Sequence, residues 1–438
     1  MKALHITAAD HGGAGRAAQK LHLRLREAGV DSRMCVFDRR TDDHWTIQLK
    51  TPSRLFGLRR FTSKALYKVI SHQDYHFQNQ EITPNVSAVD LLAQVRFSPD
   101  IVIVHYLSNF LSCQDILKLQ RISEAPVIWN LLDMGGFTGG CHYAWSCRRY
   151  EGPCGCCPAL RFPAEADVSA GMLARKYEAM KEIELTVVAG STFLGQQASR
   201  STVFRQRDIH TILIGVDSET FRQRERNEAR ALLGLPKDKR TILFGAQSSR
   251  NRRKGYEWLV RALLELAQRG AIDPASIQLI SIGDVDRSAE LADAGYSQER
   301  LGPISDESRL VLAYQAADVY ACPSVQDSGP MMINESMMCG TPVVAFEMGV
   351  AMDLVVEHET GYMVPLENHI DFANGLGKVL ALDREASKAM SNNCRNIALD
   401  KCSSEAQARR YFDLMKKLHG RGARDNDSST GKIKPADV

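Results

Sequence analysis

The densest group of reactive side chains lies in GGCHYAWSCRRYEGPCGCCPAL, residues 139–160. This stretch holds five of the 11 cysteines of the chain: Cys141, Cys147, Cys154, Cys156 and Cys157. All but Cys156 follow a spacing that ends in a C-x2-C pair, and four thiolates suit a tetrahedral zinc site or a [4Fe–4S] cluster. A thiol-rich loop without metal is the alternative. We predict structural zinc or a [4Fe–4S] cluster at Cys141, Cys147, Cys154 and Cys157.

Cations gather in a second segment, SRNRRKG, residues 249–255. Arg250, Arg253 and Lys254 follow a predicted strand, at the edge where parallel α/β sheets bind ligands. Arginine can donate two hydrogen bonds to phosphate oxygens, and lysine adds a point charge. The alternative is a solvated run of charge. The place between a strand and a helix favours phosphate binding.

Two carboxylates stand seven residues apart in PSVQDSGPMMINESMMCG, residues 323–340. Asp327 follows a predicted strand, Gly329-Pro330 opens a helix, and Glu335 lies about one and a half turns into that helix. This order suits the hydroxyls of a sugar, a diphosphate and the hydroxyls of a ribose. Asp327 as a plain helix cap is the alternative.

A glycine-rich turn, ADHGGAGRAA at residues 9–18, follows a strand and opens a helix. Backbone N–H groups at such a helix start can face a phosphate. Gly13, Gly15 and Ala18 also fit the dinucleotide fingerprint, and Asp38 follows a second strand at about the right distance, roughly 20 residues on. An NAD-dependent or iron–sulfur oxidoreductase is therefore an alternative function, and a tight turn without a ligand is a third possibility.

Buried strands that alternate with helices must position these residues. Apolar runs predict strands at 1–8, 32–37, 101–105, 127–131 and 186–189, then at 241–245, 277–282, 319–322 and 342–346. The predicted helices include 14–28, 176–185, 256–269, 310–317 and 331–339. Fully apolar strands separated by helices indicate parallel sheets covered on both faces. The fold class is therefore α/β, with two alternating halves joined near residue 212.

Composition narrows the class of protein further. A chain of 438 residues with 44% hydrophobic residues suggests two or three domains, and a net charge of +3 gives no reason to expect nucleic-acid binding. No signal peptide and no apolar run of about 18 residues is present, so we expect a cytoplasmic protein. Residues 420–438 are polar and rich in Gly, Asp and Ser, and we predict a disordered tail there.

Residues 53–70, SRLFGLRRFTSKALYKVI, mix cations with large apolar side chains. One interpretation is a helix on an anionic membrane surface, which would place the protein at the inner face of the membrane. The other is an ordinary domain helix whose cations extend along its surface to water. Peripheral membrane contact is therefore an open expectation.

Several motifs together resemble one family. They are GGAGRAA, ILIGVDSETF, RRKG, LGPISDESRLVLAYQAADVYACPS, the acidic pair running into NESMMCGTPVVAF, and HETGYMVP. From Met1 to about Leu418 the chain resembles a family 4 retaining glycosyltransferase of the GT-B fold, in a subgroup with a Cys-rich TGGCHY loop. The resemblance implies two Rossmann-like domains that face each other across a cleft.

The resemblance also implies the domain plan and the reaction. Residues 1–211 would form the acceptor-side domain with the Cys-rich loop 139–160, and residues 212–398 the donor-binding domain. Residues 399–419 would form a helix that packs back on the first domain, before the tail at 420–438. The enzyme would move a sugar from a nucleoside-diphosphate sugar to a glycan or lipid-linked acceptor in polysaccharide or glycoconjugate biosynthesis, without a catalytic divalent metal.

The family's site residues carry over by motif. The implied donor-binding residues are Gly12, Gly13, Ala14, Arg250, Arg253, Lys254, Gly329, Pro330, Met331 and Glu335. The implied catalytic residues are Asp327, Lys254, Arg253 and Asp133. Asp327 would bind the donor sugar, Lys254 with Arg253 the diphosphate, and Glu335 the ribose.

One departure concerns the reaction centre. The family's histidine there is Leu132 in this chain, and a leucine cannot hydrogen-bond. Asp133, His105 or His142 would supply the polar contact, or donor binding is altered. A catalytically inactive binding protein of the same fold is therefore a further alternative. The Cys-rich loop is expected to shape the acceptor site with Arg148, Arg149 and Tyr150.

Overall fold

The computed structural model describes residues 1–50, 56–79, 83, 86–270 and 272–429, with residues 421–429 described as backbone only. The chain divides into two compact units. Unit 1 comprises Met1–Ala189, Gln197–Ile212 and Gln407–Val438, and unit 2 comprises Gly190–Gln196 and Leu213–Ala406. The segment 190–196, expected in the first domain, thus belongs to unit 2, because the Thr192 backbone N–H donates to the Asp353 carboxylate at 3.0 Å.

Unit 1 is built on a parallel sheet with the strand order β3-β2-β1-β4-β5-β6-β7 in the described residues. The strands are β1 Lys2–Ala9, β2 Asp31–Asp38, β3 Thr46–Gln48, β4 Ile101–Val104, β5 Val127–Leu131, β6 Leu185–Ala189 and β7 Asp208–Thr211. β4 and β5 are buried along their whole length. The carboxyl ends of these strands meet at one edge of the sheet, and the loops that leave this edge carry the predicted site residues.

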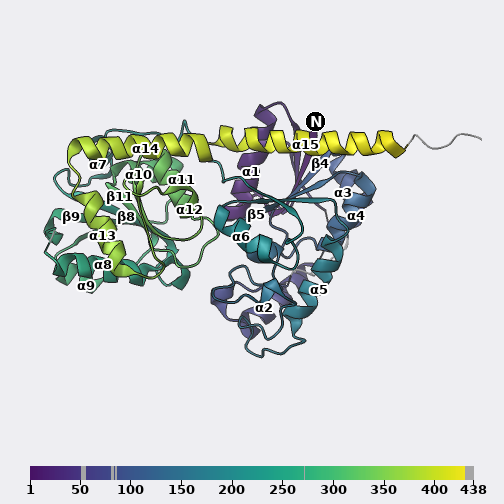
Figure 1. The fold of residues 1–438 in the computed structure, drawn as a ribbon, viewed down its shortest axis with the longest axis horizontal. Coiled ribbons are helices and arrows are strands. Elements are labelled where there is room, and N and C mark those ends of the chain that lie inside the picture. Colours follow the sequence, from purple (N-terminus) through teal and green to yellow (C-terminus); the bar gives the residue numbers. More distant parts are fainter. Residues whose placement is uncertain (51–55, 80–82, 84–85, 271, 430–438) are drawn as a thin grey trace, which may run out of the picture. The chain divides into compact units, whose positions relative to one another are not determined.

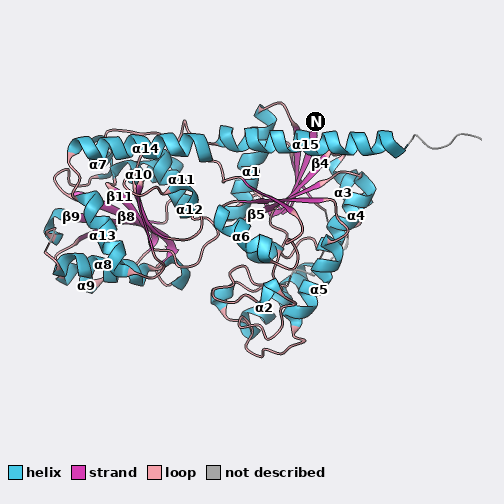
Figure 2. Ribbon diagram, in the orientation of Figure 1, coloured by secondary structure: helices cyan, strands magenta, loops and turns pink. Residues whose placement is uncertain are grey.

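Helices cover both faces of this sheet (Figure 2). The helices that lie wholly within unit 1 are α1 Gly12–Glu27, α2 Phe56–Ile70, α3 Ala88–Val95, α4 Cys113–Ser123 and α5 Val168–Met180, whereas α6 Thr192–Arg200 begins in unit 2 and ends in unit 1. The prediction of a helix over 176–185 was wrong in its bounds. Asp167 caps α5 by accepting the backbone N–H groups of Ser169 and Ala170, which sets the start of the helix eight residues earlier.

Unit 2 repeats the plan with a parallel sheet of order β10-β9-β8-β11-β12-β13. Its strands are β8 Arg240–Ser248, β9 Ile277–Asp284, β10 Ser297–Gly302, β11 Val319–Cys322, β12 Val343–Phe346 and β13 Gly361–Val364. Its helices are α7 Arg226–Leu233, α8 Tyr256–Gln268, α9 Ala289–Asp293, α10 Glu307–Ala316, α11 Met331–Met338, α12 Ala351–Leu354, α13 His369–Leu380 and α14 Arg384–Cys402.

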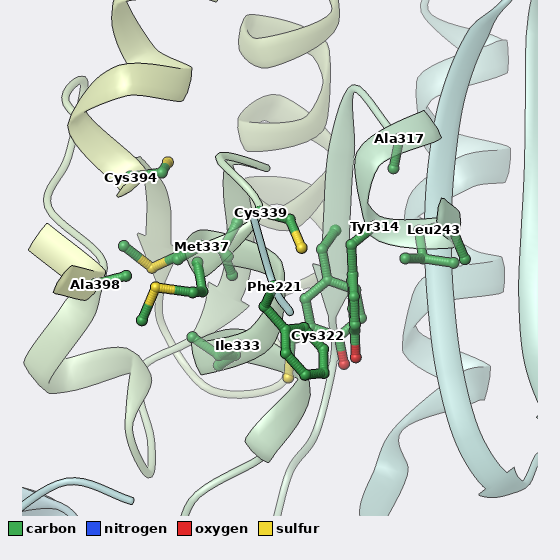
Figure 3. Close-up of a cluster of buried hydrophobic side chains, with 14 of the residues drawn as sticks. Phe221, Leu243, Tyr314, Ala317, Cys322, Ile333, Met337, Cys339, Cys394 and Ala398 are labelled. Atoms are coloured by element: carbon green, nitrogen blue, oxygen red, sulfur yellow. The ribbon is translucent and has the colours of Figure 1, made fainter. Parts of the chain in front are cut away.

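The core of unit 2 explains the cysteines of this unit. Cys322, Cys339 and Cys394 are buried among Phe221, Tyr314 and neighbouring apolar side chains (Figure 3). Burial raises the pKa of the Cys322 thiol above its ordinary value, so the group stays protonated at neutral pH. These cysteines therefore act as small apolar side chains.

The last helix, α15 Ser404–Ser429, returns to unit 1 (Figure 1). Tyr411 and Met415 are fully buried in a core that also contains Leu21 and Ile101. The prediction of disorder from residue 420 was wrong for residues 420–429, which continue this helix. Extending an existing helix avoids the cost of nucleation, and this offsets the low helix propensity of the Gly, Asp, Asn and Ser residues in this segment. Residues 430–438 lie outside the described residues.

No helix among the described residues is long and apolar enough to cross a membrane.

Candidate functional site

Two cations converge on one carboxylate in unit 2. Arg253 Nη1 and Lys254 Nζ each donate to Asp327 Oδ2 at 2.6 Å. Arg253 and Lys254 lie in a 3₁₀ turn, Arg252–Lys254, between β8 and α8. Gly255 closes this turn at φ +68°, and a Cβ there would lie 1.7 Å from the Pro323 carbonyl oxygen. The glycine therefore lets the cation turn pack directly against the segment that carries Asp327.

The charges of this cluster are largely withdrawn from water. The side chains of Arg253, Lys254 and Asp327 are 13%, 19% and 11% exposed. Burial alone would raise the pKa of Asp327, but Lys254 and then Arg253 outweigh it, so that this pKa lies well below its usual range. The carboxylate is therefore ionised at any physiological pH, and the two cations are held where a diphosphate could bind.

The segment after Asp327 begins α11. The Gly329 backbone N–H donates to Asp327 Oδ1 at 3.3 Å, Pro330 is the N-cap of the helix, and Met331 is its first residue. Glu335 is held from the core, because the Tyr314 hydroxyl donates to its Oε2 at 2.6 Å. Burial raises the pKa of Tyr314 well above its ordinary value, so its hydroxyl remains a donor. Tyr314 was not among the predicted site residues, because its role carries no local signal in the sequence.

Arg250 stands apart from this cluster. Its side chain is 87% exposed, and its guanidinium lies 4.0 Å from the Asp286 carboxylate. The structure thus brings Arg253, Lys254 and Asp327 together and leaves Arg250 at the surface.

The glycine-rich turn of unit 1 leads directly into α1. Gly12 has φ +72°, and a Cβ on Gly12 or Gly13 would meet no atom within 4 Å, so the start of this helix is open to an approaching group. Gly15 differs, because a Cβ there would lie 2.5 Å from the Ala9 carbonyl oxygen. Packing of α1 on β1 therefore accounts for Gly15. Asp38, the ribose ligand of the NAD alternative, lies 2.9 Å from His11 Nε2.

A pocket of about 40 Å³ lies at the carboxyl ends of β4 and β5 in unit 1. Leu132, Asp133 and His142 line it together with Ser108. His142 Nδ1 lies 2.9 Å from Asp133 Oδ2, and His142 Nε2 lies 3.3 Å from Ser108 Oγ. Burial alone would raise the pKa of Asp133, but His142 and the Gly135 N–H lower it below its ordinary value. An ionised Asp133 therefore orients the imidazole of His142 beside Leu132.

Backbone contacts hold this pair in place. The Gly135 N–H donates to Asp133 Oδ1 at 2.8 Å, and a Cβ on Gly135 would lie 2.7 Å from the His142 ring. Lys176 of α5 is buried and donates to the carbonyl oxygens of Gly135 and Thr138 at 2.6 and 2.7 Å. Only a glycine at 135 leaves room for the imidazole. Lys176 was not among the predicted site residues, although a lysine on a mostly apolar helix face is a signal that could have identified it.

His105 lines the same pocket but is engaged in the core. Its Nε2 lies 2.9 Å from His5 Nδ1, and its Nδ1 lies 2.9 Å from Asn130 Nδ2. Burial, followed by His22, lowers the pKa of His105 to about 3, so the ring is neutral. The nitrogens of His105 therefore contact His5 and Asn130, whereas the nitrogens of His142 contact Asp133 and Ser108, both of which line the pocket.

The Cys-rich loop gathers the four predicted ligands around one small pocket. Cys141, Cys147, Cys154 and Cys157 line it, and Cys156 does not. Cys154 and Cys156 have φ of +58° and +38°, a backbone strain that a loop keeps only when other contacts impose it. In the described residues, however, no group of three or more His, Cys, Asp or Glu side chains is arranged to hold a metal ion.

Two side chains of this loop differ from expectation. Tyr150 is 4% exposed and packs against Phe137, with ring centroids 5.6 Å apart, so it faces the core rather than an acceptor. Arg148 pairs with Glu151 at 3.0 Å. The prediction that Tyr150 meets an acceptor was therefore wrong, because an aromatic ring in this loop gains more from burial.

A second pocket of unit 1, about 230 Å³ in volume, runs along α2. Lys64, Tyr67 and Lys68 line it from the helix, and Gln78 and Asn109 line it from the loops. The Asn109 amide donates to Gln78 Oε1 at 2.8 Å, and the Tyr106 hydroxyl donates to the same atom at 3.0 Å. Tyr106 lines the pocket beside His142, so Gln78 is hydrogen-bonded to a residue in the lining of that other pocket.

Comparison with known proteins agrees with this geometry. Residues 239–381 match the model of the family described as "Glycosyl transferases group 1". This part of the chain is a group 1 glycosyltransferase domain. It contains Arg253, Lys254, Asp327 and Glu335, so the predicted family is supported where the cation cluster lies. The comparisons say nothing of a Cys-rich subgroup.

Similar proteins extend the comparison beyond this domain. A D-inositol 3-phosphate glycosyltransferase from Saccharomonospora viridis is 32% identical over 203 residues, 43% of this chain. The match spans 46% of that protein, less than half the length of the relative. Sucrose-phosphate synthase from Thermosynechococcus elongatus has a TM-score of 0.63 at 20% identity, covering 96% of this chain and 99% of that one.

A further similar structure contains a nucleotide sugar. HepE of Anabaena, in complex with UDP-glucose, has a TM-score of 0.60 at 15% identity and covers 95% of this chain and all of that one. Because both solved structures share 20% or less of their sequence with this chain, their similarity to it shows the fold alone. The predicted α/β fold with two parallel Rossmann-like sheets, as in GT-B glycosyltransferases, is confirmed.

Proposed function

We propose that the protein is a retaining glycosyltransferase that moves a sugar from a nucleoside-diphosphate sugar to an acceptor hydroxyl in polysaccharide or glycoconjugate biosynthesis. The observation that carries the proposal is the buried cluster of Arg253 and Lys254 on Asp327. Two cations and a carboxylate have no part in the transfer of a hydride, so the cluster favours sugar transfer over the oxidoreductase alternative. The family match to residues 239–381 supports the same function.

The chemistry of donor binding follows from this cluster. Arg253 and Lys254 would exchange part of their contact with Asp327 for the diphosphate oxygens, and they would stabilise the charge that develops on the leaving nucleotide. Asp327 would then accept hydrogen bonds from the hydroxyls of the donor sugar. Glu335, oriented by Tyr314, would accept hydrogen bonds from the ribose hydroxyls. The glycine-rich start of α1 remains a predicted contact of the diphosphate.

The donor nucleotide is proposed to be UDP. The support is the likeness to Anabaena HepE, whose structure contains UDP-glucose. Titration of the protein with UDP, GDP and ADP by calorimetry, followed by UDP-sugar hydrolysis and transfer assays, tests this. Binding of no nucleotide diphosphate would contradict the donor site, and binding without hydrolysis or transfer would favour the inactive binding protein.

In unit 1 we propose that His142 supplies the polar contact that Leu132 cannot make. His142 and Leu132 line one pocket, and Asp133 orients the imidazole at 2.9 Å. The acceptor would reach this pocket past Lys64 and Lys68, whose charges suit a phosphate on a glycan or lipid-linked acceptor.

Gly135→Ala tests the role of His142 without changing any polar group. The new Cβ would displace the His142 ring, so transfer should fall at least about tenfold while UDP binding stays unchanged. Gly171→Ala, at an exterior position of α5 where the nearest atom is 3.5 Å away, is the matched control. Unchanged transfer in Gly135→Ala would refute the role of His142.

We further propose that Cys141, Cys147, Cys154 and Cys157 hold a structural zinc ion or a [4Fe–4S] cluster. The four thiols line one pocket, and burial raises the pKa of Cys154 to about 11, so binding would have to release protons. The group would staple a loop that lacks regular structure.

Metal and sulfide analysis of protein purified without oxygen, with its visible spectrum, distinguishes the possibilities. One zinc and no colour would indicate the zinc staple, and about four irons with brown colour the cluster. Cys147→Ser should lose the metal, whereas Cys156→Ser should keep it. Freshly purified protein with neither metal would overturn the proposal.

A further inference from the structure

Helix α2 turns its apolar side chains outward. Phe61 is 71% exposed, Val69 67%, Leu58 59% and Leu66 53%. The residues that α2 buries are instead Phe56, Ser63 and Tyr67. An ordinary domain helix does the reverse and packs its large apolar side chains on the core.

The exposed apolar side chains form one continuous face. At 100° per residue, Leu58, Phe61, Ala65, Leu66 and Val69 fall within an arc of about 140°. The buried residues project from the opposite side of the helix. Thr62 also lies in this arc, and its hydroxyl donates to the Leu58 carbonyl oxygen at 3.1 Å. The polar group of this threonine is therefore satisfied within the helix if water leaves the face.

Cations border the apolar face. Arg59 lies on one flank, Lys64 and Lys68 lie on the other, and all three are exposed. The range 56–70 contains no Asp or Glu. Arg60 points the other way, with its guanidinium 4.6 Å from the centre of the Phe37 ring at the end of β2. The face is thus apolar in the middle and positive at its edges.

Phe162 is a further exposed aromatic residue, and it follows a short backbone pairing at the end of α2. Ser71 forms an antiparallel bridge with Leu160, and the Arg161 N–H donates to the Ile70 carbonyl oxygen at 2.9 Å. The next residue, Phe162, is 81% exposed, the highest value among the large hydrophobic side chains of the described residues. Phe162 therefore adds to the apolar surface near the end of α2.

We propose that this face of α2, with Phe162, docks unit 1 on an anionic lipid membrane. The apolar side chains would enter the boundary between head groups and acyl chains, and Arg59, Lys64 and Lys68 would contact lipid phosphates. A second copy of this chain fits less well, because two such helices would bring cations against cations. The docking does not depend on the proposed sugar transfer.

Vesicle co-sedimentation of the full chain tests the proposal. We expect the protein to bind vesicles in which about a third of the lipid is phosphatidylglycerol, and to bind pure phosphatidylcholine vesicles much less. Binding should weaken from about 50 mM to about 500 mM salt, because salt screens the cations. No binding to the anionic vesicles at low salt would overturn the proposal.

Two variants separate docking from folding. The double variant Phe61→Asp and Val69→Asp should weaken vesicle binding at least about tenfold with an unchanged melting temperature, because both side chains are already in water. Leu232→Asp is the matched control, since Leu232 is 62% exposed on α7 of unit 2. Equal loss in the control would overturn the proposal.

Light scattering tests whether a second copy of the chain, rather than a membrane, covers this face. We expect the wild-type chain and the double variant to have the same mass in solution. A dimeric wild-type chain and a monomeric double variant would assign the face to a second copy, and this result would overturn membrane docking.

Discussion

Replacing Asp327 with Asn removes one charge from the buried cluster and leaves its size unchanged. Asp327 Oδ2 is the acceptor of both Arg253 and Lys254 at 2.6 Å, and all three side chains are less than a fifth exposed. Removing one partner of a buried ion pair costs about 3–5 kcal/mol, because the remaining charge is left without compensation. Both cations can move partly into water, so we expect about 3 kcal/mol of lost unfolding free energy at neutral pH.

The pH dependence of this loss follows from the direction of the pKa shift. The folded pKa of Asp327 lies below its unfolded value of about 4. The stabilisation by the ionised carboxylate is therefore fully present above about pH 5, and it declines as the pH falls toward the folded pKa. The difference in stability between wild type and Asp327→Asn should thus be constant at neutral pH and shrink in acid.

UDP should partly restore the stability of Asp327→Asn. A diphosphate offers negative charge to the same Arg253 and Lys254 that lost their carboxylate, so UDP should raise the melting temperature of the variant more than that of the wild type. Sugar transfer should fall by about 10²–10³-fold, since the contact to the donor sugar is lost. Rescued stability with lost transfer would separate phosphate binding from catalysis.

The assay must report unit 2 alone, because two units can unfold separately. Trp258 is the single tryptophan of residues 213–406, out of four in the chain, so fluorotryptophan labelling and ¹⁹F NMR can follow its unit in urea. Asp306→Asn is the matched control, an exposed N-cap of α10 where asparagine caps equally well. Equal stability of Asp327→Asn and wild type at pH 7 would refute the buried ion pairs.

Two further substitutions have controls within the same chain. Gly255→Ala should lower the unfolding free energy by about 2–5 kcal/mol in urea unfolding, because its Cβ would overlap a carbonyl oxygen at 1.7 Å as well as requiring φ +68°. Gly270→Ala shares the positive φ but meets no atom within 4 Å, and it should cost only about 1–2 kcal/mol; equal costs would exclude the overlap. Tyr314→Phe removes the 2.6 Å bond to Glu335 and should weaken UDP binding about tenfold by calorimetry. Tyr411→Phe, whose hydroxyl has no hydrogen-bond partner within the described residues, should leave UDP binding unchanged; an equal loss there would contradict the role of Glu335.

Much of the fold could be predicted from local pattern. The strand predicted at 319–322 coincides with β11, and the continuous apolar runs at 101–105 and 127–131 match β4 and β5 closely. Short strands such as β3 and β7 were missed, because they have few apolar residues and are specified by pairing with neighbours. The start of α5 was missed because it depends on the Asp167 cap, upstream of the apolar pattern.

The sequence by itself determined the residue types at the proposed donor site. Lys254 and Asp327 follow strands with a local apolar pattern, and Glu335 lies within the helix that comes next, so their chemistry and order along the chain could be interpreted without coordinates. The composition of residues 53–70 likewise indicated an amphipathic helix, though not which side of it faces the protein.

Only the tertiary structure decided which of these groups meet. Arg253 and Lys254 reach Asp327 across more than seventy residues, whereas Arg250, only three residues from Arg253, points into water. Tertiary packing also determines that the apolar face of α2 points outward and that His142 lies beside Leu132. The reason is physical: a side chain's direction depends on how its element packs against distant ones, and that packing energy is absent from any local window of sequence.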